Sequence, residues 1–440
     1  MSTGDRMSSG AERAMESLGR TVQSQIYRAG AFGRRPVVPV SPDALESAAR
    51  RRMSKQAYVY VAGSAGMQRT AQANRDALDR QPIVPRMLVD VGTRHLGIEL
   101  LGRPLPTPFL LAPVGVLEMA HAEADLAVAR AAAQTGVPMV FSTQASRSME
   151  ETSAAMGDAQ RWFQLYWSSN DDLVASMVAR AEAAGCSAIV VTLDTHVLGW
   201  RPWDLDLGFL PFARGQGIAQ YTSDPVFMEL VRERASRMSS GERPAQPRPN
   251  LAAVRTLASV SRSHPGDFVG NLRSPLPRAA VETFLDVFSR STLTWKDLAF
   301  LRERTRLPIL LKGIQHPDDA THALDAGVDG IVVSNHGGRQ VDGAIGSLDA
   351  LGPIVERVGG AVPVLFDSGI RSGADAFKAL ALGARAVLVG RPYVYGLALA
   401  GQEGVRAVLQ HLIAELDLTM ALTGCRTIAD ITPATLAPPR

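Results

Sequence analysis

The residues that decide the fold run from 308 to 338 and read PILLKGIQHPDDATHALDAGVDGIVVSNHGG. Two short runs of apolar and β-branched residues, PILLKG and GIVV, stand on either side of PDDATHALDAG, a segment with helical period. The helical segment closes on Gly327, a residue type that ends many helices before a strand. This arrangement predicts two parallel strands joined by a crossover helix.

The same rhythm extends outward from this unit over most of the chain after Pro108. Successive apolar runs end roughly 24 to 31 residues apart, the length of one βα unit, except between Asp194 and Lys312. Continuous apolar runs are typical of a parallel sheet buried on both faces, and eight in series favour a closed (β/α)8 TIM barrel over an open doubly wound sheet. The runs are PFLLAP (ending near Pro113), PMVFS (Ser142), RWFQLY (Tyr166), AIVVTLD (Asp194), PILLKG (Lys312), GIVVSNH (His336), PVLFD (Asp367) and AVLVGR (Arg391).

The composition is that of an ordinary globular enzyme, with 440 residues, 46% of them hydrophobic and 20% charged. The formal net charge is +3, and no Lys/Arg-rich run has interleaved aromatic residues, so we expect no nucleic-acid partner. No uncharged run reaches the roughly 18 residues that span a bilayer, and the first residues lack the apolar core of a secretory signal. Cys186 and Cys425 form neither a disulfide framework nor a metal-ligand pattern. We therefore expect a cytoplasmic protein without a metal site or a membrane anchor.

The domain organisation follows from where the rhythm is absent. Residues 1–40 are polar and Gly-containing and are expected to be weakly ordered; residues 41–440 are expected to form the barrel domain. Ser41 and Pro42 predict the start of a helix that runs to about Val61 and ends at AGSAG. A long insertion, residues 195–300, interrupts the barrel.

The insertion holds WRPWDLDLGFLPFARGQG, a charged helical piece at 226–238, and SSGERPAQPRPN, which is expected to be flexible. It follows the fourth strand, at the rim where such barrels place their active sites, which favours a lid. The alternative is a structural excursion or a contact between subunits.

Polar or charged residues stand at nearly every strand end, and parallel strands bring them to one rim. The loops DSGIRSGAD and GRP, after the seventh and eighth strands, carry Gly369, Arg371, Gly390 and Arg391. Bare backbone and guanidinium groups in these two loops are typical of a phosphate site.

A second constellation centres on SNHGGRQVDG, residues 334–343. His336 is a candidate general base, and Arg339 can hold a carboxylate in bidentate fashion. Lys312 admits two readings, a Schiff-base nucleophile or a fixed cation that stabilises an anionic ring, and the residues alone do not separate them. The expected partners are Asp194, which can orient the imidazole, Arg201, which adds a second cation, and the phenols of Tyr60 and Tyr166.

The motif SNHGGRQVDG, with LPILLKG before it and PVLFDSGIRSGADAFKALALGARAVLVGRP after it, resembles the FMN-dependent 2-hydroxy-acid oxidase and dehydrogenase family. The resemblance extends from about Ser41 to TMALTGC and implies that Lys312 is the fixed cation beside the flavin. It further implies the base His336 with its orienting carboxylate Asp194, and substrate contacts from Tyr60, Tyr166, Arg201 and Arg339. The FMN contacts that it implies are Pro113, Val114, Gly115, Ser142, Gln164, Thr192, Lys312, Ser334, Asp367, Ser368, Gly369, Arg371, Gly390 and Arg391.

The resemblance also implies a reaction, in which an L-2-hydroxy acid reduces FMN and O₂ reoxidises it, and a homotetramer or homo-octamer. Two outcomes are open: an oxidase releases the keto acid and H₂O₂, whereas a lactate 2-monooxygenase keeps pyruvate bound and yields acetate, CO₂ and water. The length of the insertion and Gly115 in APVGV favour the monooxygenase. Ser368 stands where many relatives have glycine, with a small expected effect. The distant alternatives are a flavin-free, phosphate-binding barrel with a Schiff-base lysine, and a non-catalytic barrel.

Overall fold

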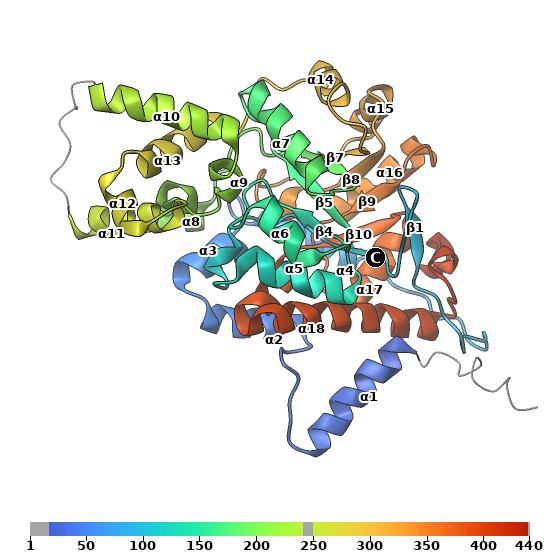
Figure 1. Ribbon diagram of the computed structural model, residues 1–440. Coiled ribbons are helices and arrows are strands. Elements are labelled where there is room, and N and C mark those ends of the chain that lie inside the picture. The colour runs from blue at the N-terminus through green and yellow to red at the C-terminus, as the bar shows by residue number, and fades with distance from the viewer. Residues whose placement is uncertain (1–16, 241–249, 439–440) are drawn as a thin grey trace, which may run out of the picture.

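The computed structural model describes residues 17–240 and 250–438. Eight parallel strands close into a barrel in the order β10-β3-β4-β5-β6-β7-β8-β9 (Figure 1). Each of the eight predicted runs forms one of these strands, so the predicted (β/α)8 barrel is confirmed. The strands are β3 (Phe109–Leu111), β4 (Met139–Phe141), β5 (Arg161–Leu165), β6 (Ile189–Thr192), β7 (Ile309–Ile314), β8 (Gly330–Val333), β9 (Val364–Phe366) and β10 (Ala386–Val389).

The core lies inside the barrel and between the barrel and its helices. All strand residues of the barrel are buried except Arg161 and Gly313, which are partly buried. Burial on both faces explains why the strands read as continuous apolar runs and do not alternate. The outer helices are α5 (Ala124–Thr135), α6 (Met149–Met156), α7 (Asp171–Ala183), α15 (Pro317–Asp325), α16 (Ser347–Val358), α17 (Gly373–Ala381) and α18 (Arg391–Thr423), the last broken at Ala400 and Gly401.

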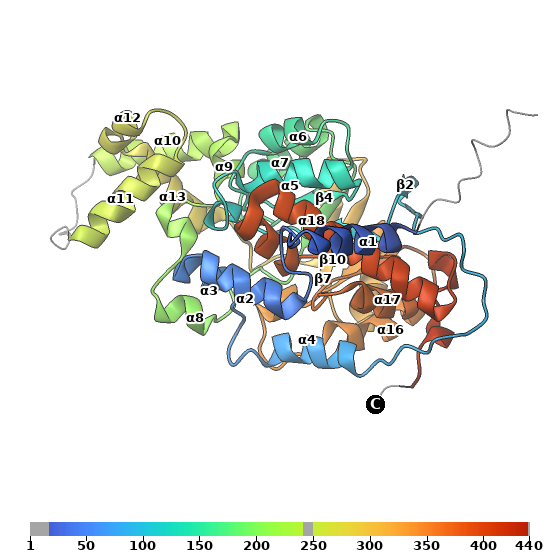
Figure 2. The same ribbon diagram turned by 90° about the horizontal axis from the view of Figure 1, so that it is seen from below.

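The N-terminal stretch differs from the expectation of weak order over residues 1–40. Helix α1 (Leu18–Ala31) packs on α18, as Figure 2 shows from below. The buried carboxylate of Asp417 accepts hydrogen bonds from Gly19 N at 2.9 Å and from Arg94 Nε at 2.8 Å. These charge-assisted contacts hold the start of α1 on the barrel. Residues 1–16 lie outside the described residues.

The helix expected from Ser41 to Val61 is two helices, α2 (Pro42–Arg52) and α3 (Lys55–Ala62). The break occurs because Ser54 takes an extended conformation and its hydroxyl accepts from Ala57 N at 3.1 Å, capping α3. Helix α4 (Arg69–Asp79) and a small hairpin, β1 (Ile98–Leu100) and β2 (Arg103–Leu105), lead into the barrel.

The insertion between β6 and β7 forms a helical layer beside the barrel, at the left of Figure 1. An aromatic cluster holds it together: the ring centroid of Phe284 lies 5.1 Å from that of Phe212, 4.8 Å from that of Tyr221 and 5.3 Å from that of Phe288. The predicted charged helix is confirmed as α10, whereas most of SSGERPAQPRPN falls at 241–249, outside the described residues. The elements are α8 (Pro202–Asp206), η2 (Pro211–Arg214), α9 (Ala219–Thr222), α10 (Pro225–Ser240), α11 (Leu251–Ser263), α12 (Phe268–Arg273), α13 (Leu276–Val287) and α14 (Leu298–Arg302).

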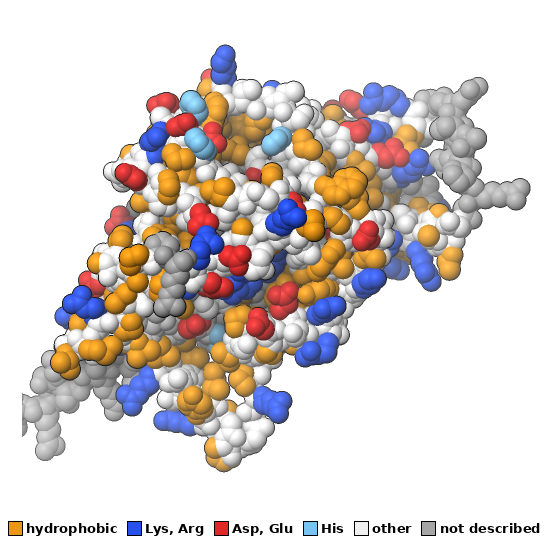
Figure 3. Space-filling model, turned by 180° about the vertical axis from the view of Figure 1, so that it is seen from behind, with side chains coloured by type: hydrophobic (Ala, Val, Ile, Leu, Met, Phe, Trp, Pro, Cys, Tyr) orange, Lys and Arg blue, Asp and Glu red, His pale blue; other side chains and the backbone are white. Residues whose placement is uncertain are grey.

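The surface carries mixed charge. Figure 3 shows basic and acidic side chains interspersed over the face that it presents. Among the helices that the structure describes, none combines the length and the apolar character needed to cross a bilayer.

Candidate active site

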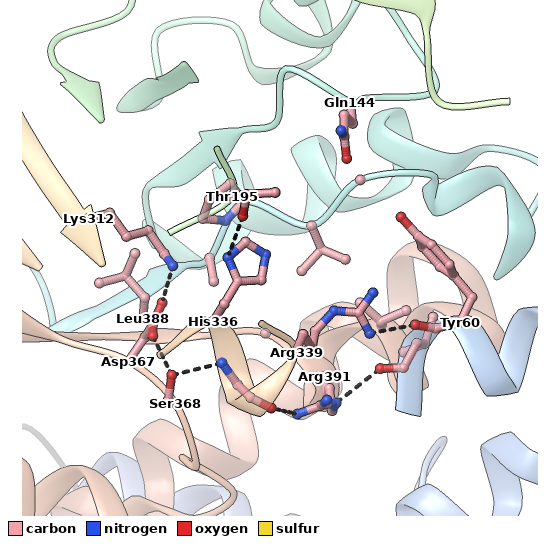
Figure 4. Close-up of a pocket in the computed structure, with 18 of the residues that line it drawn as sticks. Tyr60, Gln144, Thr195, Lys312, His336, Arg339, Asp367, Ser368, Leu388 and Arg391 are labelled. Atoms are coloured by element: carbon pink, nitrogen blue, oxygen red, sulfur yellow. Dashed lines mark hydrogen bonds and ion pairs between the residues drawn. The ribbon is translucent and has the colours of Figure 1, made fainter. Parts of the chain in front are cut away.

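A cavity of about 1020 Å³, its open mouth included, lies at the carboxyl ends of the barrel strands. Figure 4 shows Lys312, His336, Arg339 and Tyr60 facing this space; His336 and Arg339 come from one loop, and the other two from separate parts of the chain. Ser142, Gln164, Thr192 and Ser334 are buried at the ends of the same strands. The predicted site residues that line the cavity are Tyr60, Pro113, Val114, Gly115, Tyr166, Arg201, Lys312, His336, Arg339, Asp367, Ser368, Gly369, Arg371, Gly390 and Arg391.

The imidazole of His336 is oriented by Asp194, which stands behind it. The distance from His336 Nδ1 to Asp194 Oδ1 is 2.7 Å. Burial outweighs the attraction of Asp194 and lowers the pKa of His336. Burial alone would raise the pKa of Asp194, but the charges of His336 and Lys312 lower it to about 2. A neutral imidazole that donates Nδ1–H to a carboxylate keeps the lone pair of Nε2 free to accept a proton.

Two guanidiniums meet at the mouth of the cavity. Arg339 Nη1 donates to the backbone oxygens of Tyr60 at 2.6 Å and of Gly63 at 3.0 Å. Arg201 Nε donates to Arg339 O at 3.1 Å, and burial together with the charge of Arg339 lowers the pKa of Arg201 to about 10. Two buried guanidiniums that donate only to neutral oxygens keep their positive charge available, which suits an anionic ligand such as a carboxylate.

Two phenols complete this end of the cavity. The Arg339 guanidinium carbon lies 5.2 Å from the ring centroid of Tyr60. Burial raises the pKa of Tyr60, and it raises the pKa of Tyr166 to about 12. Both hydroxyls are therefore protonated near neutral pH and can donate hydrogen bonds to a substrate.

Lys312 is a fixed cation in this structure. Its Nζ lies 3.1 Å from Asp367 Oδ2 and donates to Ser334 Oγ at 2.8 Å. Burial alone would lower the pKa of Lys312, but Asp367 and Asp194 outweigh it and raise that pKa. A Schiff-base nucleophile must be a neutral amine, so the geometry favours the electrostatic reading of Lys312.

The residues expected around a flavin ring fit an acceptor-rich planar ligand. The carboxamide of Gln164 is held by Thr143 N, which donates to Oε1 at 3.1 Å, while Nε2 is buried without a hydrogen-bond partner in the described residues. The hydroxyl of Thr192 is also buried without a described partner. Unsatisfied polar groups at this depth are costly unless a ligand pairs with them. Together with Lys312 they suit the carbonyl edge of an isoalloxazine.

The other end of the cavity suits a phosphate. Burial, followed by the charge of Arg371, lowers the pKa of Arg391 to about 10. Arg391 donates to neutral groups, including Val61 O, Gly63 O and Ser64 Oγ, each at 3.0 Å. A Cβ added at Gly390 would meet nothing closer than 3.9 Å, so the backbone is open to a bound group there. These features could hold a phosphate, and the phosphate site stays a prediction.

Several residues of the site were missed by sequence reasoning. Leu198 and Phe212 of the insertion line the cavity, and so does Gln144. Thr195 Oγ1 donates to Asp194 Oδ1 at 3.0 Å and also lines the cavity. Only the apolar character of the insertion could have pointed to Leu198 and Phe212.

Gln340 was also missed, although it belongs to the quoted motif. Its Nε2 donates to Asp194 O at 2.6 Å and to Val197 O at 2.9 Å, and its Oε1 accepts from Arg201 Nη2 at 3.0 Å. One carboxamide therefore ties the start of the insertion to the loop that carries His336.

Comparisons with known proteins show the family of this chain. A family model described as FMN-dependent dehydrogenase matches residues 49–438. The chain is 41% identical over 409 residues to an FMN-dependent alpha-hydroxy acid dehydrogenase of Penicillium citrinum, covering 93% of each chain. It is 42% identical over 394 residues to an L-lactate oxidase of Lysinibacillus sphaericus, covering 89% of this chain and 91% of the relative. A crystal structure of mandelate oxidase with (S)-4-hydroxymandelic acid is similar with a TM-score of 0.73 and 38% identity, covering 91% of this chain and 98% of that one.

Proposed function

This chain belongs to the FMN-dependent dehydrogenase family and is an FMN-dependent oxidoreductase of 2-hydroxy acids, and we propose that it is an L-lactate 2-monooxygenase. The proposed overall reaction converts L-lactate and O₂ into acetate, CO₂ and water. The observation that carries the proposal is that a neutral, oriented imidazole and two guanidiniums lie in one cavity that the insertion helps to enclose; within residues 17–240 and 250–438 neither guanidinium forms an ion pair with a carboxylate.

The chain's own residues divide the work of substrate oxidation. Arg201 and Arg339 hold the substrate carboxylate, and Tyr60 and Tyr166 donate hydrogen bonds to its oxygens. His336 Nε2 accepts the hydroxyl proton, and the imidazolium that forms is stabilised by Asp194 at 2.7 Å from Nδ1. This assignment applies when the Cα hydrogen leaves as a hydride; when it leaves as a proton, His336 Nε2 accepts that proton instead, and the contacts to the carboxylate and the hydroxyl oxygen are the same.

FMN supplies the two-electron acceptor and, once reduced, the reaction with O₂. Lys312 would place a fixed positive charge beside the carbonyl edge of the bound ring and would stabilise negative charge there. The residues that would hold FMN are Pro113, Val114, Gly115, Ser142, Gln164, Thr192, Lys312 and Ser334 around the ring and ribityl chain, and Asp367, Ser368, Gly369, Arg371, Gly390 and Arg391 toward the phosphate.

The monooxygenase outcome requires that pyruvate stays bound until peroxide has decarboxylated it. Leu198 and Phe212, both from the insertion, line the cavity and support such retention. Gly115 supports it as well, because its missing side chain lets Gln144, which lines the cavity, pack directly against the Gly115 backbone. The second candidate is an oxidase that releases the keto acid and H₂O₂, and the identity to an L-lactate oxidase favours it.

One assay separates the two outcomes. Purified protein reconstituted with FMN is given L-lactate in air, and acetate, pyruvate and H₂O₂ are quantified together. We expect acetate in near-equal amount to the O₂ consumed, with little free peroxide. Equal amounts of pyruvate and peroxide without acetate would establish the oxidase instead, and protein that lactate cannot bleach anaerobically would contradict both.

We also propose a homotetramer or homo-octamer that resides in the cytoplasm. The exposed aromatic side chains of Tyr27 and Phe32 support a contact surface between subunits. The thiols of Cys186 and Cys425 are free and buried, which suits a reducing compartment. Light scattering coupled to size-exclusion chromatography gives the assembly state directly, and a monomer would contradict the proposal.

A further inference from the structure

Ser368 has a backbone conformation that serine rarely adopts. It follows strand β9 with φ of +81°, in the left-handed region where residues with a side chain are disfavoured. Its side chain is nearly enclosed, with a relative exposure of 8%. A strained residue at a functional site points to a contact that outweighs the strain.

The hydroxyl of Ser368 bridges two parts of the barrel rim. It donates to Asp367 Oδ1 at 2.8 Å, as Figure 4 shows. It also accepts from Gly337 N at 2.9 Å and from Asn335 N at 3.3 Å. Because the hydroxyl hydrogen is donated to the carboxylate of Asp367, the lone pairs of the hydroxyl oxygen are left to accept from the two amides. Those amides flank His336.

The turn that carries His336 is itself strained. His336 has φ of +57°, and Gly337 and Gly338 follow with φ of +66° and +76°. Its amides are held by side chains: Ser334 Oγ accepts from His336 N at 3.1 Å, while Ser368 takes the amides of Asn335 and Gly337. The hydroxyls of Ser334 and Ser368 therefore hold the turn in place, although the backbone conformation of His336 in it is unfavourable.

Both hydroxyls lead back to one cation. Lys312 Nζ donates to Ser334 Oγ at 2.8 Å and pairs with Asp367 Oδ2 at 3.1 Å, while the second oxygen of Asp367 holds Ser368. Two separate chains of contacts therefore connect Lys312 to the turn, one through Ser334 and one through Asp367 and Ser368. Loss of either chain is expected to change the position of the imidazole relative to the Lys312 ammonium.

We propose that Ser368 is a positioning residue that fixes the turn bearing His336 and couples its orientation to Lys312. This inference rests on the proposed function, because it assigns Ser368 to the placement of the proton acceptor for the hydroxy acid. It replaces the small effect that the sequence predicts for serine at this position. The two guanidiniums that would hold the substrate carboxylate have contacts of their own: Arg339 donates to Tyr60 O and Gly63 O, and Arg201 donates to Arg339 O and Gln340 Oε1.

Two variants separate the hydroxyl from the backbone strain. Ser368→Ala removes the hydroxyl and keeps the unfavourable φ, whereas Ser368→Gly removes both, and glycine tolerates this conformation. Leu88→Gly is the matched control, because Leu88 also has a positive φ, +59°, and is fully exposed at 106%. The FMN-loaded enzymes are compared by anaerobic stopped-flow reduction with L-lactate and by amide hydrogen exchange of the peptide spanning 335–338.

We expect both Ser368 variants to slow flavin reduction about 10- to 100-fold, the size of effect that a small misplacement of a catalytic group produces. The Kd for lactate should change little, and exchange of the Asn335 and Gly337 amides should accelerate in both variants. Ser368→Gly should melt no lower than Ser368→Ala, because it relieves the strain. Leu88→Gly should leave reduction and exchange at wild-type values.

The outcomes distinguish the two levels of the argument. If lactate does not reduce the FMN of the wild-type enzyme, the proposed function itself is overturned. Wild-type reduction with unchanged rates in both Ser368 variants would overturn only the role of Ser368. Slower reduction without faster exchange at 335–338 would also overturn it, since the hydroxyl would then act by another route.

Discussion

The cavity has two walls of different origin. The barrel wall consists of Lys312, His336, Asp367 and Ser368, at the ends of strands β7 to β9. An ion pair joins Lys312 to Asp367, and a hydrogen bond joins Asp367 to Ser368. The insert wall consists of Leu198, Arg201 and Phe212, which precede α9 in the inserted segment. Leu198 keeps 41% of its surface exposed, whereas Lys312 keeps 4%. We infer that the barrel wall carries out the proton and electron transfer, and that the insert wall binds the substrate carboxylate through Arg201 and governs access and retention through Leu198, its exposed member.

The largest effect is expected in the barrel wall, at His336. His336→Gln should slow flavin reduction by lactate about 1000-fold, because no general base remains, while FMN stays bound. Anaerobic stopped-flow absorbance measures it. The matched control is His196→Gln, an exposed histidine at the start of the insertion that should retain wild-type reduction. A comparable loss of the flavin-reduction rate in both variants would show that the effect is not specific to His336 in the barrel wall.

Asp194 stands at the junction of the walls and sets the pH dependence. The pKa of His336 lies below its usual value, so kcat/KM should be at its plateau at neutral pH and fall only as acid protonates the imidazole. Asp194→Asn removes the charge that raises this pKa, so the acid limb should move to lower pH while the plateau falls about 100-fold. A pH–rate profile from pH 4 to 9 measures both. An acid limb that moves to higher pH would contradict the assignment.

Asp194 also affects stability with a definite sign. Its pKa, about 2 in the folded protein, lies below the usual aspartate value, so the stability that it contributes is present above that usual value. This contribution is lost as pH falls toward the folded pKa. Wild type and Asp194→Asn should therefore differ least in thermal midpoint at the acid end.

Arg339 belongs to the barrel but meets the insertion through Arg201. Arg339→Lys should raise the KM for lactate about 10-fold, because an ammonium cannot reproduce the planar fork. The limiting rate of flavin reduction should fall less than KM rises. Steady-state and single-turnover kinetics separate the two quantities, with Arg290→Lys, in a surface ion pair with Asp171, as control. Unchanged KM and kcat would count against the carboxylate clamp.

Gly115 tests retention of the product. A Cβ at this position would lie 2.8 Å from Gln144 O and 2.9 Å from Gln144 Cβ, so Gly115→Ala must displace the backbone at Gln144, which lines the cavity. We expect a few-fold shift from acetate toward pyruvate and peroxide at a similar rate of flavin reduction. Gly352→Ala, where a Cβ meets no atom within 4 Å, is the control. An unchanged acetate yield would show that Gly115 does not decide the outcome.

The two walls also differ in what the sequence could predict. Lys312 and His336 were found because each ends a short apolar run, and parallel strands carry such ends to one rim whatever the loops do. The position of Phe212 depends on its packing against Phe284, 72 residues later, with ring centroids 5.1 Å apart. No local pattern encodes that contact, so the insertion was recognised by its length and not by its geometry.

Side-chain bonds between distant segments were hidden for the same reason. Gln340 holds Asp194 and Arg201, each more than 130 residues away, and nothing in its neighbours distinguishes it from a surface glutamine. The sequence predicts a small effect of serine at position 368, whereas the hydroxyl of Ser368 bonds to Gly337 N and to Asp367 Oδ1. The break between α2 and α3 was missed because Ser54 also fits inside a helix, and the cap becomes visible only with coordinates.

The smallest effect is expected in the insert wall, at Leu198. Leu198→Ala removes apolar surface from the cavity. Because Leu198 is only partly buried, the loss of apolar contact is small, and the KM for lactate should rise only about 2- to 3-fold. Val197→Ala is the matched control, since Val197 is 57% exposed and does not line the cavity. If the insert wall governs access, the Leu198 variant should also gain activity on longer 2-hydroxy acids relative to lactate, whereas the rate of flavin reduction at saturating lactate should stay the same. A fall in that limiting rate, with selectivity unchanged, would mean that the insertion takes part in the chemistry and that the two walls share one role.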